Sequence, residues 1–207
     1  MLIANKKVAE VFHEIKTQKH IYRVHDLPDK EKLKSLKHIV KSFGYNLDLT
    51  SSKGISKSLN KLLNEIKGKE EQNLIESLAL RSMSKAEYST INIGHYGLAF
   101  TNYTHFTSPI RRYPDVLVHR LLELIQKKDF RKLDKSLQKK AIYCSEQEMV
   151  AAKAERDSIK FMQIKFMQEK IGETLNCIIS GVSAWGIYGA VSYTHLRAHE
   201  TIHSRGC

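Results

Sequence analysis

Two adjacent arginines lie in a segment whose residue types suit the binding of a phosphate group, YTHFTSPIRRYPD. Ser108 and Pro109 are typical of a helix start, with a hydroxyl at the N-cap and proline at the first helical position. Arg111 and Arg112 would then lie in the first turn, where the helix dipole favours an anion. A helix N-terminus combined with guanidinium groups predicts a phosphate site.

The neighbouring side chains fit the same chemistry. Arg112, Asp115 and His119 are spaced so that they share one helix face, and Asp115 would hold an arginine while orienting His119. Rings able to stack on bases surround the arginines. These rings belong to Tyr103, His105, Phe106 and Tyr113. An intrahelical salt-bridge ladder beside core aromatics is the alternative, and spacing alone leaves both interpretations open.

A nuclease could instead use histidines as acid and base, with His95, His105 and His119 as the candidates. Metal-dependent phosphodiester cleavage requires clustered carboxylates. The acidic residues are scattered among lysines and form no tight aspartate cluster, so we expect no metal site in this chain. The cysteines are few, odd in number and far apart, which argues against a disulfide framework or a zinc site.

The charge balance predicts a polyanionic partner. The chain has 207 residues, with 34 Lys and Arg against 22 Asp and Glu, a net charge of +12. Nucleic acid is the first candidate and an anionic membrane the second, while solvated basic faces are the structural alternative. No apolar run is long enough to span a membrane, and no signal peptide begins the chain. We therefore expect a cytoplasmic protein without membrane association.

Helical periodicity and turn residues predict the elements that position the arginines. Residues 88–107 are rich in glycine, asparagine, threonine and aromatic residues and predict a strand with ordered loops. The predicted helices cover residues 2–19, 28–43, 55–67, 69–83 and 109–128, with a short strand at 21–26. A long helix follows, because no glycine or proline occurs between 129 and 171. We expect its apolar stripe in the core: Ile142, Met149, Ala152, Ile159, Met162 and Phe166.

From Gly172 the pattern alternates with a period of two, which predicts two strands. Gly181 and Gly186 suit a bend or bulge between them. Two strands are not stable alone, so they would begin a β domain. Residues 192–207 resemble a translated sequencing-adapter read-through and are expected to be a non-native tail. The alternatives are a natural polar tail or a metal-binding helix face formed by its three histidines.

Several specific motifs along residues 1–190 carry a family resemblance: GHYGLAFTNYTHFTSPIRRYPDVLVHRLL, IYRVHDLPDKEKL, LALRSMSKAEYS, and AERDSIKFMQIKFMQEKIGE followed by ISGVSAWGIY. They resemble the ribonuclease II superfamily, especially its bacterial ribonuclease R branch. The resemblance implies an α+β fold. Residues 1–170 would be the mostly helical C-terminal portion of an RNB catalytic domain, and 171–191 the first strands of a truncated OB-fold RNA-binding β-barrel.

The same resemblance implies a processive, sequence-nonspecific 3′→5′ exoribonuclease that hydrolyses single-stranded or structured RNA to nucleoside 5′-monophosphates. The parent protein would be a monomer that uses Mg²⁺ to activate water and to stabilise charge on the scissile phosphate. By position in the motifs, Arg111 matches the catalytic arginine at the reacting phosphate, and Arg112 supports it. Glu155 would lie near the terminal nucleotides. His105, Thr107 and Ser108 would shape the channel floor, with Tyr103 and Tyr113 as RNA-binding rings.

The chain departs from the family pattern at both ends. The family's aspartate cluster lies upstream of the segment that matches Met1, as do its aromatic clamp on the terminal nucleotide and its N-terminal cold-shock-type domains, so the Mg²⁺ ligands would be absent from this chain. The OB-fold would be cut after two strands. We expect a fragment that is inactive alone. A non-catalytic basic RNA-binding module and a helical scaffold without a nucleic-acid role are the competing hypotheses.

Overall fold

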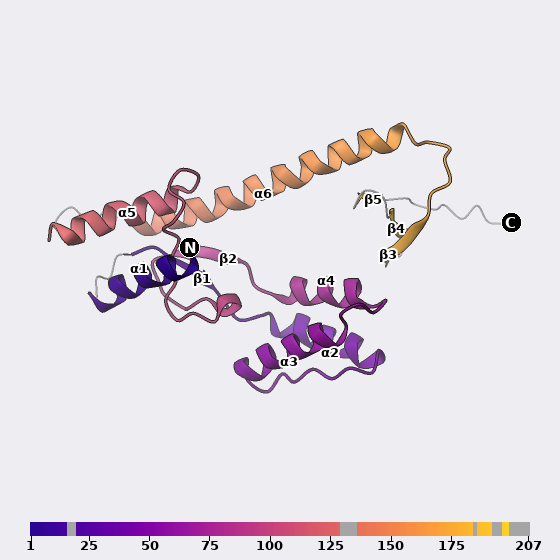
Figure 1. The fold of residues 1–207 in the computed structure, drawn as a ribbon, viewed down its shortest axis with the longest axis horizontal. Helices are drawn as coiled ribbons and strands as arrows, with labels where there is room; N and C mark the ends of the chain where they lie inside the picture. Colours follow the sequence, from indigo (N-terminus) through magenta and orange to yellow (C-terminus); the bar gives the residue numbers. More distant parts are fainter. Residues whose placement is uncertain (16–19, 129–135, 184–185, 192–195, 199–207) are drawn as a thin grey trace. The chain divides into compact units, whose positions relative to one another are not determined.

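The computed structural model describes residues 1–15, 20–128, 136–183, 186–191 and 196–198 (Figure 1). These residues form an α+β structure that is mostly helical, as the sequence predicts. The chain divides into two compact units, residues 1–147 and 148–207.

The first unit contains helices around a short antiparallel strand pair (Figure 1). Its elements are α1 (Leu2–Glu14), β1 (Tyr22–His25), α2 (Lys30–Ser42), α3 (Ser52–Glu65), α4 (Gln72–Ser82), β2 (Ala86–Ser89), the 3-10 helix η1 (Tyr96–Leu98), α5 (Tyr113–Gln126) and the start of α6 (Leu137–Gln168). In the β1–β2 pair, Tyr22 lies opposite Ser89 and His25 opposite Ala86. The helices predicted between residues 28 and 83 and the strand at 21–26 are confirmed. The first predicted helix is confirmed as far as Glu14, and its predicted residues 16–19 lie outside the described residues.

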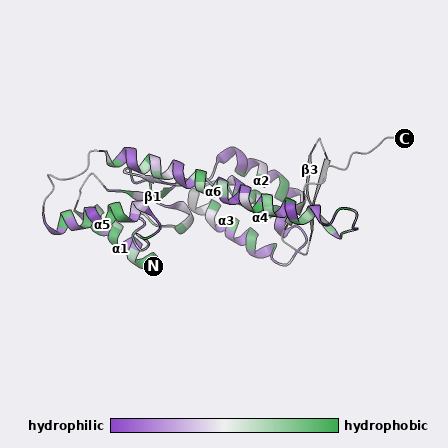
Figure 2. Ribbon diagram, turned by 90° about the horizontal axis from the view of Figure 1, so that it is seen from above, coloured by the Kyte–Doolittle hydropathy of each residue, from purple (hydrophilic) through white to green (hydrophobic). Residues whose placement is uncertain are grey.

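Helices α2, α3 and α4 share a core of their own, built mainly from leucine and isoleucine. Their hydrophobic and hydrophilic residues lie on different faces (Figure 2). Asp29 fixes the start of α2, because its carboxylate accepts the backbone N–H groups of Glu31 and Lys32 at 2.9 and 3.2 Å. Gly44, with φ of 85°, ends the helix in the left-handed conformation that glycine favours.

A second core joins α1, β2, α5 and the first turns of α6. Its buried residues are Phe12, Ile21, Tyr88, Leu117, Val118, Leu121, Leu137 and Ala141. The segment 103–112, which carries the two arginines, runs between elements of this core. Packing of α1 and α5 therefore determines where that segment lies.

Helix α5 begins later than predicted. It starts at Tyr113 with Arg112 as the N-cap residue and Pro114 in the first turn. A helix from Pro109 would place Pro114 in its interior, where proline lacks a donor and clashes with the preceding turn. Residues 108–112 form a turn instead, in which the N–H groups of Arg111 and Arg112 lie 3.3 and 3.1 Å from the Ser108 carbonyl oxygen. The predictions that Ser108 is the N-cap and that both arginines lie in the first helical turn are wrong.

The apolar stripe of α6 is exposed, so its prediction as core is wrong. Leu137 and Ala141 are the buried residues of this helix within the described part of the chain. The five large stripe residues are 44–59% exposed, and Ala152 is exposed as well. Other exposed apolar residues, such as Tyr143 and Phe161, lie between them along the helix. Apolar residues therefore surround α6, and the described core meets only its first turns.

Replacing Phe161 and Phe166 together with glutamine should leave the free energy of unfolding within about 0.5 kcal/mol of wild type, because exposed side chains contribute little packing. The same change should reduce self-association, since exposed apolar surface promotes it. Urea unfolding and light scattering measure the two effects. Leu137→Ala is the buried control on this helix, with an expected cost of about 2–5 kcal/mol. A similar cost for the glutamine variant would contradict the exposure of the two rings.

The second unit contains an antiparallel sheet in the order β3 (Cys177–Ser183), β4 (Gly186–Val191), β5 (Leu196–Ala198). The two predicted strands are present, and the register shifts between Ile179 and Gly181, as expected for a bulge. Strand β5 lies in the segment expected to be a non-native tail. The three histidines of that segment lie outside the described residues. No helix in the described ranges is long and apolar enough to cross a membrane.

Candidate nucleic-acid interface

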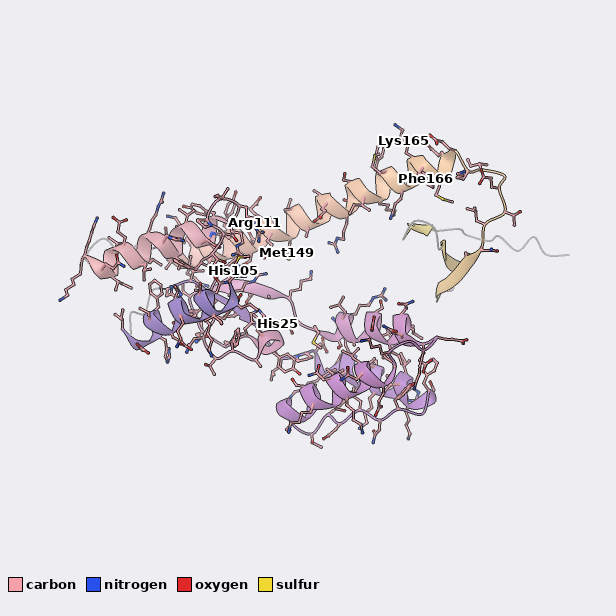
Figure 3. The ribbon with its side chains drawn as sticks, viewed as in Figure 1. His25, His105, Arg111, Met149, Lys165 and Phe166 are labelled. Atoms are coloured by element: carbon pink, nitrogen blue, oxygen red, sulfur yellow. The ribbon has the colours of Figure 1, made fainter. Side chains whose placement is uncertain are left out.

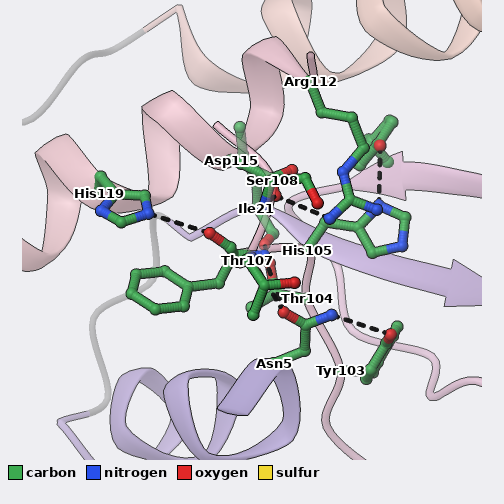
Figure 4. Close-up of polar contacts among 12 residues, drawn as sticks. Asn5, Ile21, Tyr103, Thr104, His105, Thr107, Ser108, Arg112, Asp115 and His119 are labelled. Carbon is green, nitrogen blue, oxygen red and sulfur yellow. Dashed lines mark hydrogen bonds and ion pairs between the residues drawn. The ribbon is translucent and has the colours of Figure 1, made fainter. Parts of the chain in front are cut away.

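A buried carboxylate organises the arginine-bearing turn. Asp115, in the first turn of α5, is fully buried. Its Oδ2 accepts the Ser108 N–H at 2.7 Å and a guanidinium N–H of Arg112 at 2.8 Å (Figure 4). The prediction that Asp115 holds one of the two arginines is therefore confirmed, and the structure shows that this arginine is Arg112. Asp115 also places negative charge at the positive end of α5, which is its favourable position.

The Arg112–Asp115 pair retains unused hydrogen-bonding capacity. The Arg112 side chain is only 18% exposed. Its Nε and the second oxygen of Asp115, Oδ1, are buried and have no hydrogen-bond partner among the described residues. Leaving such atoms unpaired costs about 1–3 kcal/mol each. One additional donor and one additional acceptor would complete this pair.

Arg111 differs from its neighbour. It is exposed in the turn (Figure 3), and its guanidinium makes no hydrogen bond or ion pair with other residues that the structure describes. Ile110 beside it is fully exposed, and Tyr113 is 48% exposed. The turn thus presents a cation, an apolar side chain and an aromatic ring to solvent. This combination suits a phosphate with an adjacent base.

Asn5 of α1 holds the preceding segment in place. Its Nδ2 donates to the Tyr103 hydroxyl at 3.1 Å, and its Oδ1 accepts the N–H groups of Phe106 and Thr107 at 3.1 and 3.2 Å (Figure 4). The sequence motifs did not single out Asn5. The available signal was a polar residue at helical spacing from the buried Ala9 and Phe12.

His105 and Tyr103 line the interior side of this segment. The Tyr103 ring is buried and lies edge-on to His105, with ring centres 5.8 Å apart. His105 Nδ1 lies 2.9 Å from the Tyr88 hydroxyl. Burial, followed by the positive charges of Arg112 and Arg23, lowers the pKa of His105 to about 3. His105 is therefore neutral at physiological pH and does not provide a cation for a phosphate.

His119 does not contact Asp115, so the expectation that Asp115 orients it is wrong. Its Nε2 lies 2.9 Å from the Phe106 carbonyl oxygen, and its ring stacks on the Phe106 ring at 4.1 Å. His95, the third candidate histidine, packs edge-on against the Tyr103 ring. Burial, with the nearby His25 and Arg23, lowers the pKa of His95 to about 4.

The described residues do not fit a metal ion. Within them, no three or more His, Cys, Asp or Glu side chains lie close enough to hold one. Asp115 is already bound by Ser108 and Arg112. Thr107 and Ser108 are partly buried next to the turn, and Glu155 is exposed on α6 in the second unit. The RNA-binding roles of these residues stay predictions.

The sequence and fold place the chain in a known family. The family model "RNB domain" matches residues 1–128, and the chain therefore belongs to the RNB-domain family. Ribonuclease R of Aquifex aeolicus is 40% identical over 171 residues, which cover 81% of this chain and 24% of that protein. The chain thus spans about a quarter of the length of this curated relative.

Three solved structures resemble the chain. RNase R of Mycoplasma genitalium, in complex with ribose-methylated single-stranded RNA, has a TM-score of 0.82 and 32% identity, covering 95% of this chain and 32% of that chain. The same protein in complex with double-stranded RNA gives a TM-score of 0.81. Yeast Ssd1, a pseudonuclease, gives 0.74 with 26% identity, covering 90% of this chain and 24% of that chain.

Proposed function

We propose that this chain is part of an exoribonuclease that degrades RNA processively from the 3′ end, without sequence preference, to nucleoside 5′-monophosphates. Membership of the RNB-domain family and the likeness to an RNase R solved with RNA support this proposal. The parent acts as a monomer in the cytoplasm on single-stranded or structured RNA, without membrane association.

The observation that carries the proposal is the difference between the two arginines. Asp115 binds Arg112 and Ser108 and so fixes the turn, while Arg111 keeps its donors available. A cation on a fixed turn loses less freedom on binding than one on a mobile loop. Arg111 is therefore the catalytic residue that contacts the reacting phosphate, and Arg112 adds positive charge behind it.

The remaining candidates of the first unit form the RNA path around Arg111. Tyr113 is exposed and stacks on a base, while Thr107 and Ser108 shape the floor beneath the strand. Tyr103 and His105 support that floor from within. Glu155 belongs to the second unit, and its contact with the terminal nucleotides rests on the family resemblance alone. Mg²⁺, held by carboxylates outside this chain, supplies water activation and charge stabilisation. The residues present here bind and orient the phosphate.

Arg111→Ala should weaken binding of a fluorescent single-stranded RNA by about tenfold or more, because charge-assisted hydrogen bonds contribute about 1.5–3 kcal/mol. Fluorescence anisotropy at several salt concentrations measures the affinity, which should fall with salt for the wild-type chain. Arg81→Ala on α4 removes the same charge from an exposed position and serves as the matched control. Equal losses in the two variants would remove Arg111 from its assigned role.

A non-catalytic RNA-binding module is the second candidate, and the likeness to the pseudonuclease Ssd1 favours it. We expect this chain alone to release no mononucleotides from 5′-labelled RNA in the presence of Mg²⁺. Release would show that the chain contains its own metal ligands. The same assay on a longer protein that includes sequence encoded upstream of Met1 separates the candidates. An exoribonuclease would produce mononucleotides there, and a binding module would not.

A further inference from the structure

A cavity of about 660 Å³ lies in the first unit, and its lining contains no residue of the arginine-bearing turn. It is lined by the N-terminal half of α3, the end of β1 and the loop that carries η1. Its volume falls in the range of roughly 300–1,000 Å³ that small-molecule sites occupy. None of the lining residues belongs to the 103–115 segment.

Hydrogen bonds join the elements that form the cavity wall. His25 (Figure 3) accepts the Gly97 N–H on Nδ1 at 2.9 Å, which leaves its Nε2 to donate to the Ser84 carbonyl at 2.8 Å. A Cβ atom at Gly97 would lie 2.8 Å from His25 Nδ1, so the loop approaches β1 as closely as glycine allows. The Ser56 hydroxyl donates to the Tyr96 hydroxyl at 2.9 Å and ties α3 to this loop. These contacts make the cavity a built feature of the unit.

Three donors in the lining have no acceptor among the described residues. His95 accepts the Leu98 N–H on Nδ1 at 3.2 Å, so its neutral ring carries the proton on Nε2. The Lys57 ammonium makes no ion pair or hydrogen bond in the described part of the chain. The Tyr96 hydroxyl accepts from Ser56 and retains its own proton. Two N–H donors and one O–H donor, one of them cationic, suit a phosphate group.

The rest of the lining suits the sugar and the base of a nucleotide. Asp26 accepts the Leu27 N–H on Oδ1 at 2.7 Å and keeps Oδ2 available. A carboxylate of this kind accepts hydrogen bonds from ribose hydroxyls in many nucleotide sites. The 55% exposed Ile93 and the ring of Phe100, over which the Lys6 ammonium lies 5.2 Å from the ring centre, add a surface on which a base can lie.

We propose that this cavity binds a single ribonucleotide. Lys57, His95 and Tyr96 hold its phosphate, Asp26 holds its ribose, and the base covers Phe100 and Ile93. The site is separate from the Arg111 turn and does not rest on the hydrolysis of RNA proposed above. A nucleoside 5′-monophosphate is the smallest ligand that uses every part of the lining.

Equilibrium dialysis of the full chain with AMP, adenosine and inorganic phosphate tests this site. AMP should bind about tenfold more tightly than adenosine, because its phosphate gains charge-assisted hydrogen bonds. Phosphate alone should bind more weakly than AMP. In ¹³C-histidine NMR spectra, AMP should shift the imidazole signals of His95, which keeps a donor available, more than those of the fully bonded His25.

Lys57→Ala should reduce the advantage of AMP over adenosine, because it removes the one cation among the three groups that hold the phosphate. Lys61→Ala is the matched control, since Lys61 lies one turn further along α3, is exposed, pairs with Glu65 at 3.6 Å and does not line the cavity. Both variants remove one charge, so long-range electrostatics changes equally. Equal affinity for AMP and adenosine, equal effects of the two lysine variants, or unchanged His95 signals would each overturn the proposal.

Discussion

Asp115→Ala should lower the free energy of unfolding by about 3–5 kcal/mol, the cost of breaking a buried ion pair from one side. Asp115 is fully buried, and the Arg112 side chain is 18% exposed. Removing the carboxylate leaves a guanidinium without its counter-ion and the Ser108 N–H without its acceptor. Urea unfolding at neutral pH measures the loss.

Two further variants separate charge from geometry. Asp115→Asn retains an oxygen for the Ser108 N–H but loses the charge, so its cost should lie between those of wild type and alanine. The double variant Arg112→Met/Asp115→Leu removes both charges and should recover much of the stability. A cost below about 1 kcal/mol for Asp115→Ala would be typical of an exposed pair and would contradict this arrangement.

Lowering the pH from 7 to 5 should cost about 2 kcal/mol of stability through His20 alone. His20 is fully buried and stacks on Phe12 at 3.7 Å, and neither of its ring nitrogens has a hydrogen bond to another residue that the structure describes. Burial lowers its pKa to about 3. An unfolded histidine has a pKa of about 6.5, so the unfolded state binds more protons between these values. Stability is therefore complete above about pH 6.5 and falls as the pH decreases toward 3.

His20→Phe keeps the stacking on Phe12 but cannot be protonated. Between pH 7 and pH 5, the free energy of unfolding of this variant should fall by about 2 kcal/mol less than that of wild type. The lowered pKa values of His95 and His105 also make stability depend on pH, but they contribute equally to both proteins. Their contributions therefore cancel when the variant is compared with wild type. His38→Gln, which replaces an exposed histidine on α2, is the matched control for the loss of a buried one. An identical pH dependence for His20→Phe and wild type would contradict the buried, neutral state of His20.

Local patterns predicted the elements well because their causes are local. The periodicity of α2, its end at Gly44 and the bulge near Gly181 depend on neighbouring residues alone. The start of α5 depended on two competing prolines, and Pro114 excluded the helix that Pro109 favoured. Whether the apolar residues of α6 are buried depends on which elements pack against the helix. Hydrophobic periodicity carries no information on that point, so the exposure of α6 was not predicted.

The candidate site was predicted in part. Sequence spacing predicted that Asp115 holds one of the two arginines, and the Arg112–Asp115 pair is such a local contact. The pairing of His119 with Phe106, and the bonds of Asn5 to residues of the later loop, join segments that no local pattern relates. Arg111 is exposed and Arg112 is mostly buried. This difference depends on the turn before α5, which exists because Pro114 prevents an earlier helix start.

The bonds of Asn5 have a consequence for the order of folding. They join residues 98 to 102 positions apart in the chain, whereas the core of α2, α3 and α4 is closed within residues 33–79. Closing a long loop costs more entropy than closing a short one, and non-local contacts form slowly. The three-helix core therefore has the topology of a fast, early-forming nucleus. The arginine-bearing turn becomes ordered late, after its segment has docked on α1. The part of the chain that we assign to RNA binding is therefore the last to fold.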